Sequence, residues 1–353
     1  LPHSRQDRGS TEDPKATGEP TTARFTARFL TQNAAIEKII TTHVHSPRIA
    51  SFYALESGLL HREGYGFLNE EGRNLPPPKV VAGRDVDIND YQVQSLGRQI
   101  LQSISPHAVL ADYLLHESSL VGTPYLQDGG ARLVFKAVDK GNKAFIDAVY
   151  GASFLPHATR IICNKLRTAK NDPSKVEVEI LEVLGDDDLS AKMEVLADDG
   201  VDTAGTLIKT ASWSDDGNLC SATGKKYGRP EERFVYFTHA WLGGQGYESI
   251  QRTLVENLRA QEFVTTNTRP FISNEQYYRF KDRSTILRFA GLWADAILAM
   301  ETGQDVSTRY QGFSSEEEQH QFINRLYALK RHSRHFLSDG PENRRDVHFL
   351  VRE

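Results

Sequence analysis

The spacing of apolar residues changes along the chain, and this change limits the possible folds more than any other feature of the sequence. In KVEVEILEV, residues 175–183, valine and isoleucine alternate with glutamate, which is typical of a strand with one buried and one exposed face. Short apolar runs at 131–138, 193–197 and 206–213 predict further strands. The stretches GDDD and ADDG between them have turn composition, because Asp bonds nearby backbone groups and Gly permits positive φ. Short strands at this spacing indicate an antiparallel meander.

The C-terminal part of the chain follows a helical period instead. Apolar residues three or four positions apart predict one long helix there; they are Ile286, Phe289, Trp293, Ile297 and Met300. In a last predicted helix, Ser315 and Glu318 have the spacing of an N-terminal capping box. Similar stripes at 23–41, 89–104 and 144–168 predict further helices.

These patterns predict an α+β fold, with a predominantly α-helical body and a β-rich, acidic insertion in the middle of the chain. Residues 1–22 are rich in Pro, Gly and charge, and we expect a flexible N-terminal arm. Residues 23–130 together with 231–353 would form a mainly helical, shell-like core domain. Residues 131–230 would form a β-rich, acidic subdomain that is inserted in the core or projects from it.

The charge balance argues against a protein that grips nucleic acid along its whole surface. The 353 residues carry a formal net charge of -5, whereas phosphate binding favours a basic excess. Local contact with nucleic acid remains a hypothesis for five basic residues, which are Arg24, Arg28, Lys330, Arg331 and Arg334. The alternative is ordinary: a surface helix near the start of the chain, and cations that complement a helix C-terminus near its end.

Several polar groups are candidates for chemical sites, and none is assigned a catalytic, metal-binding or cofactor-binding role. His43-Val44-His45 would place two imidazoles on one side of a strand, yet no further ligands with metal spacing follow. The acidic set lacks a calcium-loop pattern and is interpreted as solvated turns; it comprises Asp186, Asp187, Asp188, Asp198, Asp199 and Asp202.

The glycine-rich turn at 243–246 lies between an expected strand and an expected helix, where backbone amides can hold an anion. It does not match the dinucleotide pattern, because Ser249 stands where the third glycine belongs. His239 precedes this turn and could act there as an acid–base group. An ordinary tight turn is the competing interpretation.

The absence of a recognised catalytic pattern favours a non-enzymatic, self-assembling structural protein. The most specific form of this hypothesis is a viral capsid or nucleocapsid-like subunit, a virion component that packs against many copies of itself through its arm and helical body. One alternative is an enzyme that uses the turn at 243–246 with His239. The other is a helical module for protein–protein interaction.

The expected location is the cytoplasm or a virion. No apolar run approaches the roughly 18–20 residues that cross a bilayer, and the first residues lack the apolar core of a secretory signal. The chain begins with Leu1 instead of Met, which is expected of a fragment, a processed product or part of a longer chain.

Overall fold

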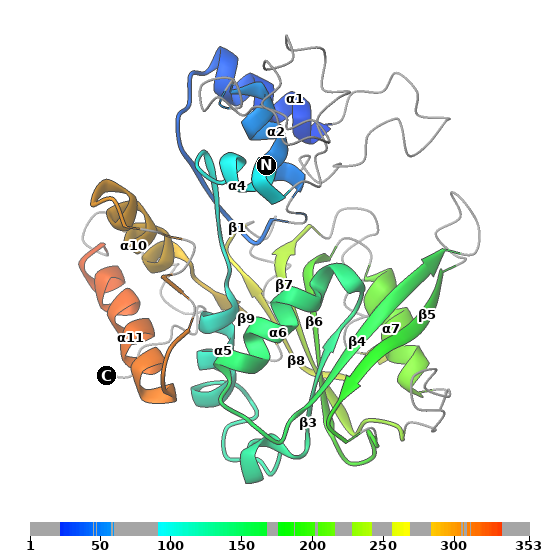
Figure 1. Cartoon of the computed structure of the whole chain (residues 1–353). Coiled ribbons are helices and arrows are strands. Elements are labelled where there is room, and N and C mark those ends of the chain that lie inside the picture. Colours follow the sequence, from blue (N-terminus) through cyan, green and yellow to red (C-terminus); the bar gives the residue numbers. More distant parts are fainter. Residues whose placement is uncertain are drawn as a thin grey trace, which may run out of the picture. The chain divides into compact units, whose positions relative to one another are not determined.

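The computed structural model divides the chain into two compact units, Leu1–Ile104 and Ser105–Glu353 (Figure 1). The structure describes residues 22–44, 46, 48–57, 59, 91–167, 176–186, 188–201, 204–215, 228–241, 256–268, 284–304, 306, 309–310 and 312–333. This division differs from the predicted one, in which residues 23–130 joined 231–353. Apart from Thr22, the predicted arm at 1–22 lies outside the described residues.

The first unit contains short helices and one pair of parallel strands. Its elements are α1 (Thr22–Arg28), the π-helix η2 (Phe29–Asn33), β1 (Ile39–Thr42), α2 (Arg48–Glu56), α4 (Tyr91–Gly97) and β2 (Leu101–Ile104). Helix α4 packs closely on α2, since a Cβ at Gly97 would lie 1.8 Å from the Ala50 carbonyl oxygen. The helices predicted at 23–41 and 89–104 begin close to the predicted residues. Each helical stretch ends before its predicted last residue, and a strand follows it.

The second unit is built on a seven-stranded sheet in the order β5-β4-β3-β6-β7-β8-β9. The strands are β3 (Leu133–Ala137), β4 (Thr159–Arg167), β5 (Val176–Leu184), β6 (Met193–Val201), β7 (Glu232–Ala240), β8 (Ala260–Thr266) and β9 (Ser284–Leu287). Strand β5 runs antiparallel to β4, and every other neighbouring pair in this sheet is parallel.

Helices cover both faces of this sheet. The described helices of this unit are α5 (His107–His116), α6 (Lys143–Ala152), α7 (Gly205–Asp215), α10 (Ala290–Glu301) and α11 (Glu316–Ser333), with short 3-10 turns η3 (Asp128–Gly130) and η4 (Lys140–Asn142). Helix α11 packs on α5 and α10. On β3, the Phe135 ring meets Tyr150 of α6, whereas the Lys136 ammonium meets Ser214 of α7. Neighbouring strand residues point to opposite faces, so α6 and α7 lie on opposite sides of the sheet (Figure 1).

The predicted fold class is wrong, because the second unit is an α/β layer with a mostly parallel sheet. Strands β7, β8 and β9 lie beyond residue 231 and continue the sheet that was predicted to end at residue 230. Parallel strands are covered on both faces and lose the alternation of a half-exposed strand; all nine residues of β6 are buried. The predicted meander is wrong for the same reason, and ADDG lies inside β6 instead of in a turn.

Two further segments differ from the prediction in their secondary structure. Residues 206–213 belong to helix α7 instead of a strand, and residues 159–167 form strand β4 instead of the end of a helix. The strands predicted at 131–138, 175–183 and 193–197 are confirmed by β3, β5 and β6. One half of the predicted capping box of α11 is confirmed, since the Glu318 amide donates to Ser315 Oγ at 3.1 Å. The Glu318 carboxylate accepts from the backbone N–H of Ser314, at 2.8 Å, instead of that of Ser315.

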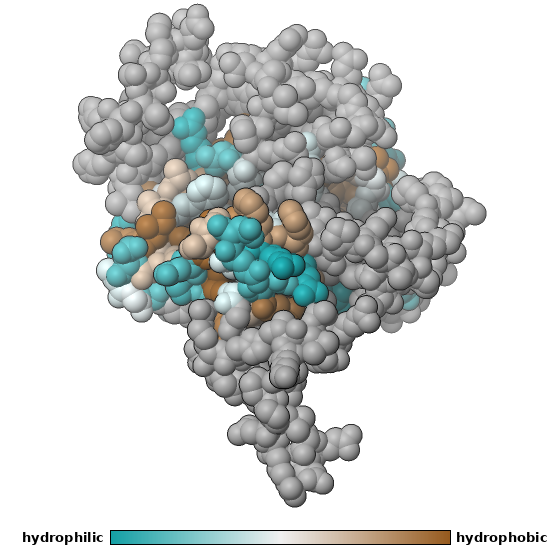
Figure 2. All heavy atoms as spheres, turned by 90° about the horizontal axis from the view of Figure 1, so that it is seen from above, coloured by the Kyte–Doolittle hydropathy of each residue, from teal (hydrophilic) through white to brown (hydrophobic). Residues whose placement is uncertain are grey.

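The surface of the described residues mixes polar and apolar groups. Figure 2 shows hydrophobic side chains interspersed with hydrophilic ones on the face that it draws. Helix α10 exposes three large apolar side chains, Trp293, Ile297 and Leu298. Within the described part of the chain, no helix combines the length and the apolar character needed to cross a membrane.

Candidate functional site

The order of the strands places a natural ligand site at the carboxyl ends of β3 and β6. In the sheet, β4 lies next to β3 on one side, and β5 lies beyond β4. The chain then returns and forms β6 next to β3 on its opposite side. Ligands of open parallel sheets bind outside the carboxyl ends of the strands where the order reverses in this way. Ala137 pairs with Ala197 at this point. The residues that follow this pair are therefore the first candidates for function.

Two adjacent acids, Asp198 and Asp199, lie at this position near the end of β6. Only 7% and 4% of their surfaces are exposed. Asp198 Oδ1 accepts hydrogen bonds from the Asn142 side-chain amide and from the Asp199 backbone N–H, both at 2.9 Å. Asn142 is itself held by Asp139, whose Oδ1 accepts from the Asn142 backbone N–H at 3.2 Å. The ends of both strands thus form one polar cluster.

This cluster concentrates negative charge. Burial raises the pKa of Asp198 well above its ordinary range, and the neighbouring carboxylates of Asp199 and Asp139 raise it further. The Asn142 amide opposes this shift but does not cancel it. Strongly perturbed acids in such a position are typical of binding and catalytic sites. Hydroxyl groups or a cation brought by a ligand would relieve the repulsion.

The N-terminus of α7 follows this acidic pair after a short connection. Ala204, just before the helix, has φ of +57°, a left-handed conformation that is costly for a residue with a Cβ. The Ile208 amide donates to the Ala204 carbonyl at 3.0 Å, so the first turn of the helix begins here. The backbone amides of the first turn of an α-helix point toward its N-terminal end. Such an end of a helix attracts phosphate and other anions.

His239 lies at the same edge of the sheet, on the next strand. It is near the carboxyl end of β7 and pairs with Gly200 of β6. A hydrogen bond of 2.8 Å joins His239 Nδ1 to Thr268 Oγ1, and its ring stacks on Trp241 with centroids 5.7 Å apart. The glycine-rich turn at 243–246 lies outside the described residues. The role of His239 as an acid–base group stays a prediction.

Two of the five basic residues predicted to contact nucleic acid, Arg24 and Arg28, have described side chains. The Arg24 guanidinium is 2.6 Å from the Glu56 carboxylate, and Arg28 donates to the Gln32 side chain at 3.2 Å. Lys330 and Arg331 belong to α11, but their side chains lie outside the described part of the chain, as does the whole of Arg334. Of the suggested histidine pair, His43 is described and has φ of +48°, whereas His45 is not described.

The sequence interpretation missed Asp198 and Asp199, because it assigned them to a solvated turn. The available signal was the order of their neighbours. The apolar run Val195-Leu196-Ala197 is followed at once by two acids, and the stretch DTAGT follows at 202–206. A buried strand that leads through such a loop into a helix is the usual setting of a phosphate site.

Comparisons with curated proteins find relatives that are enzymes by name. No protein-family model matches the chain. Over 139 residues it is 30% identical to a ribose-phosphate pyrophosphokinase of Caldanaerobacter subterraneus subsp. tengcongensis, across 39% of this chain and 37% of that protein. Over 225 residues it is 24% identical to a ribose-phosphate pyrophosphokinase of Aquifex aeolicus, across 64% of this chain and 59% of that protein. The chain thus spans between 37% and 59% of the length of these relatives.

A solved structure has a similar fold. The crystal structure of phosphoribosylpyrophosphate synthetase from Mycobacterium smegmatis matches with a TM-score of 0.50 and 19% sequence identity, over 86% of this chain and 69% of that one. At this identity the likeness shows the fold, which agrees with the parallel α/β sheet.

The prediction of a non-enzymatic structural protein, such as a capsid or virion subunit, is wrong. The curated relatives are kinases by name, and the sheet places buried acids at a position suited to a ligand. Contact with nucleic acid finds no support in these comparisons.

Proposed function

We propose that this chain binds a phosphorylated ribose at the carboxyl end of β6 and acts in pyrophosphoryl transfer to it. The observation that carries this proposal is the buried pair Asp198 and Asp199, placed just before the N-terminus of α7 at the point where the strand order reverses. The relatives named as ribose-phosphate pyrophosphokinases support the choice of ligand and reaction.

The two halves of this site suit the two halves of a sugar phosphate. Carboxylates accept hydrogen bonds from ribose hydroxyls, and an acidic residue serves this purpose in many nucleotide sites. The amides at the N-terminus of α7, with the Thr206 hydroxyl in the same turn, would hold the phosphate. The acids also offer the oxygen ligands that Mg²⁺ prefers, and that ion would neutralise charge on the transferred phosphoryl oxygens when bound.

The proposed reaction balances as follows. A ribose hydroxyl oxygen forms a bond to the β-phosphorus of a nucleoside triphosphate, and the bond between that phosphorus and the α-phosphate oxygen breaks. A nucleoside monophosphate leaves, and the hydroxyl proton passes to a base. His239, on the strand next to β6, is our candidate for that base. The Thr268 hydroxyl at its Nδ1 orients the ring.

A binding assay and a turnover assay together test this proposal. The full chain is incubated with ribose 5-phosphate, ATP and Mg²⁺, and the products are followed by ³¹P NMR. We expect a pyrophosphorylated ribose and AMP in equal amounts, and a higher midpoint of thermal unfolding with ribose 5-phosphate alone. The double variant Asp198→Asn, Asp199→Asn should lose both signals. Glu231→Gln, at an exposed pair with Arg132, is the control that should keep them.

If the wild-type chain gave no product and also no thermal shift, the proposal as a whole would be contradicted. A shift without product would contradict the transfer reaction and leave sugar phosphate binding supported. The predicted homo-oligomer stays a prediction, and light scattering on the purified chain measures its mass directly.

A further inference from the structure

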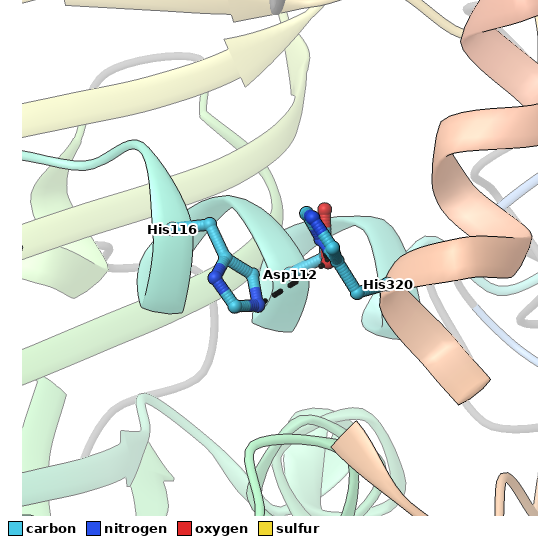
Figure 3. A group of neighbouring side chains, drawn as sticks. All are labelled: Asp112, His116 and His320. Atoms are coloured by element: carbon cyan, nitrogen blue, oxygen red, sulfur yellow. Dashed lines mark hydrogen bonds and ion pairs between the residues drawn. The ribbon is translucent and has the colours of Figure 1, made fainter. Parts of the chain in front are cut away.

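Helices α5 and α11 bring together two carboxylates and two imidazoles at their contact. Asp112 and His116 lie four residues apart on α5, and Glu316 and His320 lie four residues apart on α11. Residues at this spacing share one face of a helix. Each helix therefore presents one acid and one histidine to the other. Figure 3 shows Asp112 and His116 on α5 with His320 reaching toward Asp112 from α11.

The distances among these groups suit a small cation. His320 Nδ1 is 2.9 Å from Asp112 Oδ1, and His116 Nε2 is 3.7 Å from the same oxygen and 3.4 Å from Glu316 Oε1. One ligand atom each from Asp112, His116 and His320 can be chosen so that all lie within 4.8 Å of one another. Ligand atoms about 2.0–2.1 Å from a tetrahedral zinc ion lie roughly 3.3 Å apart, which is close to these separations.

One buried nitrogen atom of the cluster makes no hydrogen bond. This atom is His116 Nε2, and acidic oxygens of Glu316 and Asp112 lie 3.4 Å and 3.7 Å away from it. A buried polar atom without a partner costs free energy. Asp112 is 2% exposed, and its Oδ1 lies 2.9 Å from the His320 ring nitrogen Nδ1. A divalent cation would satisfy the nitrogen and the carboxylate together, whereas a single proton can be shared with only one acceptor at a time.

We propose that Asp112, His116 and His320 bind Zn²⁺, with Glu316 as the fourth ligand. Two imidazoles with one or two carboxylates favour a transition metal over Ca²⁺ or Mg²⁺, which prefer oxygen ligands alone. Neutral imidazole and ionised carboxylate are the binding forms, so uptake of the metal releases any proton held in the cluster. The ion would join α11 to α5 within the second unit.

The competing interpretation is a metal-free ion pair between Asp112 and His320, with the His116 ring at 4.2 Å from the His320 ring. The two interpretations differ in stoichiometry and in spectroscopy. The untagged full chain is stripped with a chelator, dialysed, and titrated with ZnSO₄ alone and then with CoCl₂ alone. Bound metal is measured by atomic emission and by Co²⁺ absorption.

We expect about one tightly bound Zn²⁺ per chain, a higher midpoint of thermal unfolding with Zn²⁺, and the intense visible bands of tetrahedral Co²⁺. His116→Ala and His320→Ala should each weaken binding by more than about 100-fold, since loss of an outer-shell partner alone typically costs 10–100-fold. His157→Ala is the matched control, because His157 is exposed and lies outside α5 and α11. It should bind metal like the wild type.

Two results would overturn the proposal. One is a Co²⁺ spectrum of the wild-type chain that matches the hydrated ion, a measurement that needs no variant to fold. The other is equal Zn²⁺ binding by the wild type, His116→Ala and His320→Ala. Both readouts are independent of turnover, so the outcome for this site and the outcome for the proposed reaction are separate.

Discussion

Two of the buried acids of strand β6, Glu194 and Asp198, lie four residues apart, and their surroundings carry opposite charges. Glu194 is fully buried, and two cations contact it: Lys136 Nζ at 2.8 Å and Arg233 Nε at 2.6 Å. Asp198 is also buried, but the charges that act on it are the carboxylates of Asp199 and Asp139. One strand therefore contains a compensated acid and an acid among like charges.

The pKa shifts follow from this difference. Burial alone would raise the pKa of Glu194, but Lys136 and Arg233 outweigh it and hold the pKa below the usual range. For Asp198, burial and the neighbouring carboxylates act together, and the pKa rises. A buried acid with its counter-charges in place supports the fold. A buried acid without that balance stores repulsion that a ligand can release, which is typical of a functional site.

The largest expected effect is on the compensated acid. Glu194→Gln leaves Lys136 and Arg233 close together with their shared counter-charge removed. Breaking one partner of a buried ion pair costs about 3–5 kcal/mol of unfolding free energy. Urea denaturation of the full chain measures this loss.

The control for this prediction is an exposed pair of the same type. Glu231→Gln removes a carboxylate 3.0 Å from the Arg132 guanidinium, where both side chains are about half exposed. Such a pair contributes little to stability. Equal losses for Glu194→Gln and Glu231→Gln would show that the buried cluster is not a structural centre.

Asp198→Asn should change stability in the opposite direction. The amide keeps an oxygen that can accept from Asn142 and from the Asp199 backbone, but it removes one like charge. We therefore expect a midpoint of thermal unfolding a few degrees above that of the wild type at neutral pH, together with loss of ribose 5-phosphate binding. A gain in stability with loss of function is the usual result at a strained site. A lower midpoint would contradict the comparison.

The pH dependence gives this prediction a sign that can be checked. The folded-state pKa of Asp198 is raised, so the folded chain binds this proton more tightly than the unfolded chain. The free-energy cost of ionising Asp198 in the folded wild type is therefore absent below the ordinary Asp pKa of about 3.9. This cost grows as pH rises through the raised folded-state pKa. The midpoints of the wild type and Asp198→Asn should converge on acidification and separate toward neutral pH.

The sequence predicts some elements of the second unit correctly, but it does not predict that the sheet is mostly parallel. Strand β5 lies at the edge of the sheet, so Val176, Val178 and Ile180 alternate with glutamate and the strand is recognisable. The capping residues Ser315 and Glu318 act locally, and the start of α11 is correct for that reason. Nothing so local tells a parallel sheet from an antiparallel one, because strand direction depends on the helices that cross between strands.

The site was missed because composition and burial disagree there. Asp198, Asp199 and Gly200 read as a turn, since these residue types favour turns when only neighbours in sequence are considered. In the folded chain they continue β6, and Asp198 is held by Asn142, which is 56 positions earlier in the sequence. The compensated cluster is equally non-local, since Lys136, Glu194 and Arg233 come from three different strands. Neither arrangement can be inferred from spacing.

A smaller loss of stability is expected when Ser214 is replaced, and it tests how strongly the residues around Glu194 are coupled in energy. Ser214 of α7 accepts a hydrogen bond from Lys136 Nζ at 2.5 Å and donates one to Glu194 Oε1 at 2.8 Å. Ser214→Ala removes hydrogen bonds to charged groups, which are worth about 1.5–3 kcal/mol, and keeps both counter-charges. The loss in urea denaturation should therefore be smaller than for Glu194→Gln.

The double variant Glu194→Gln, Ser214→Ala measures the coupling itself. Because Ser214 donates to the carboxylate that the first substitution replaces, the two losses should not add, and the difference from additivity should exceed about 0.5 kcal/mol. The same cycle between Ser214→Ala and Asp198→Asn should be additive if the two positions of β6 are separate in energy as well as in charge. Coupling of similar size in both cycles would mean that the strand carries one extended polar network instead of a structural acid and a functional one.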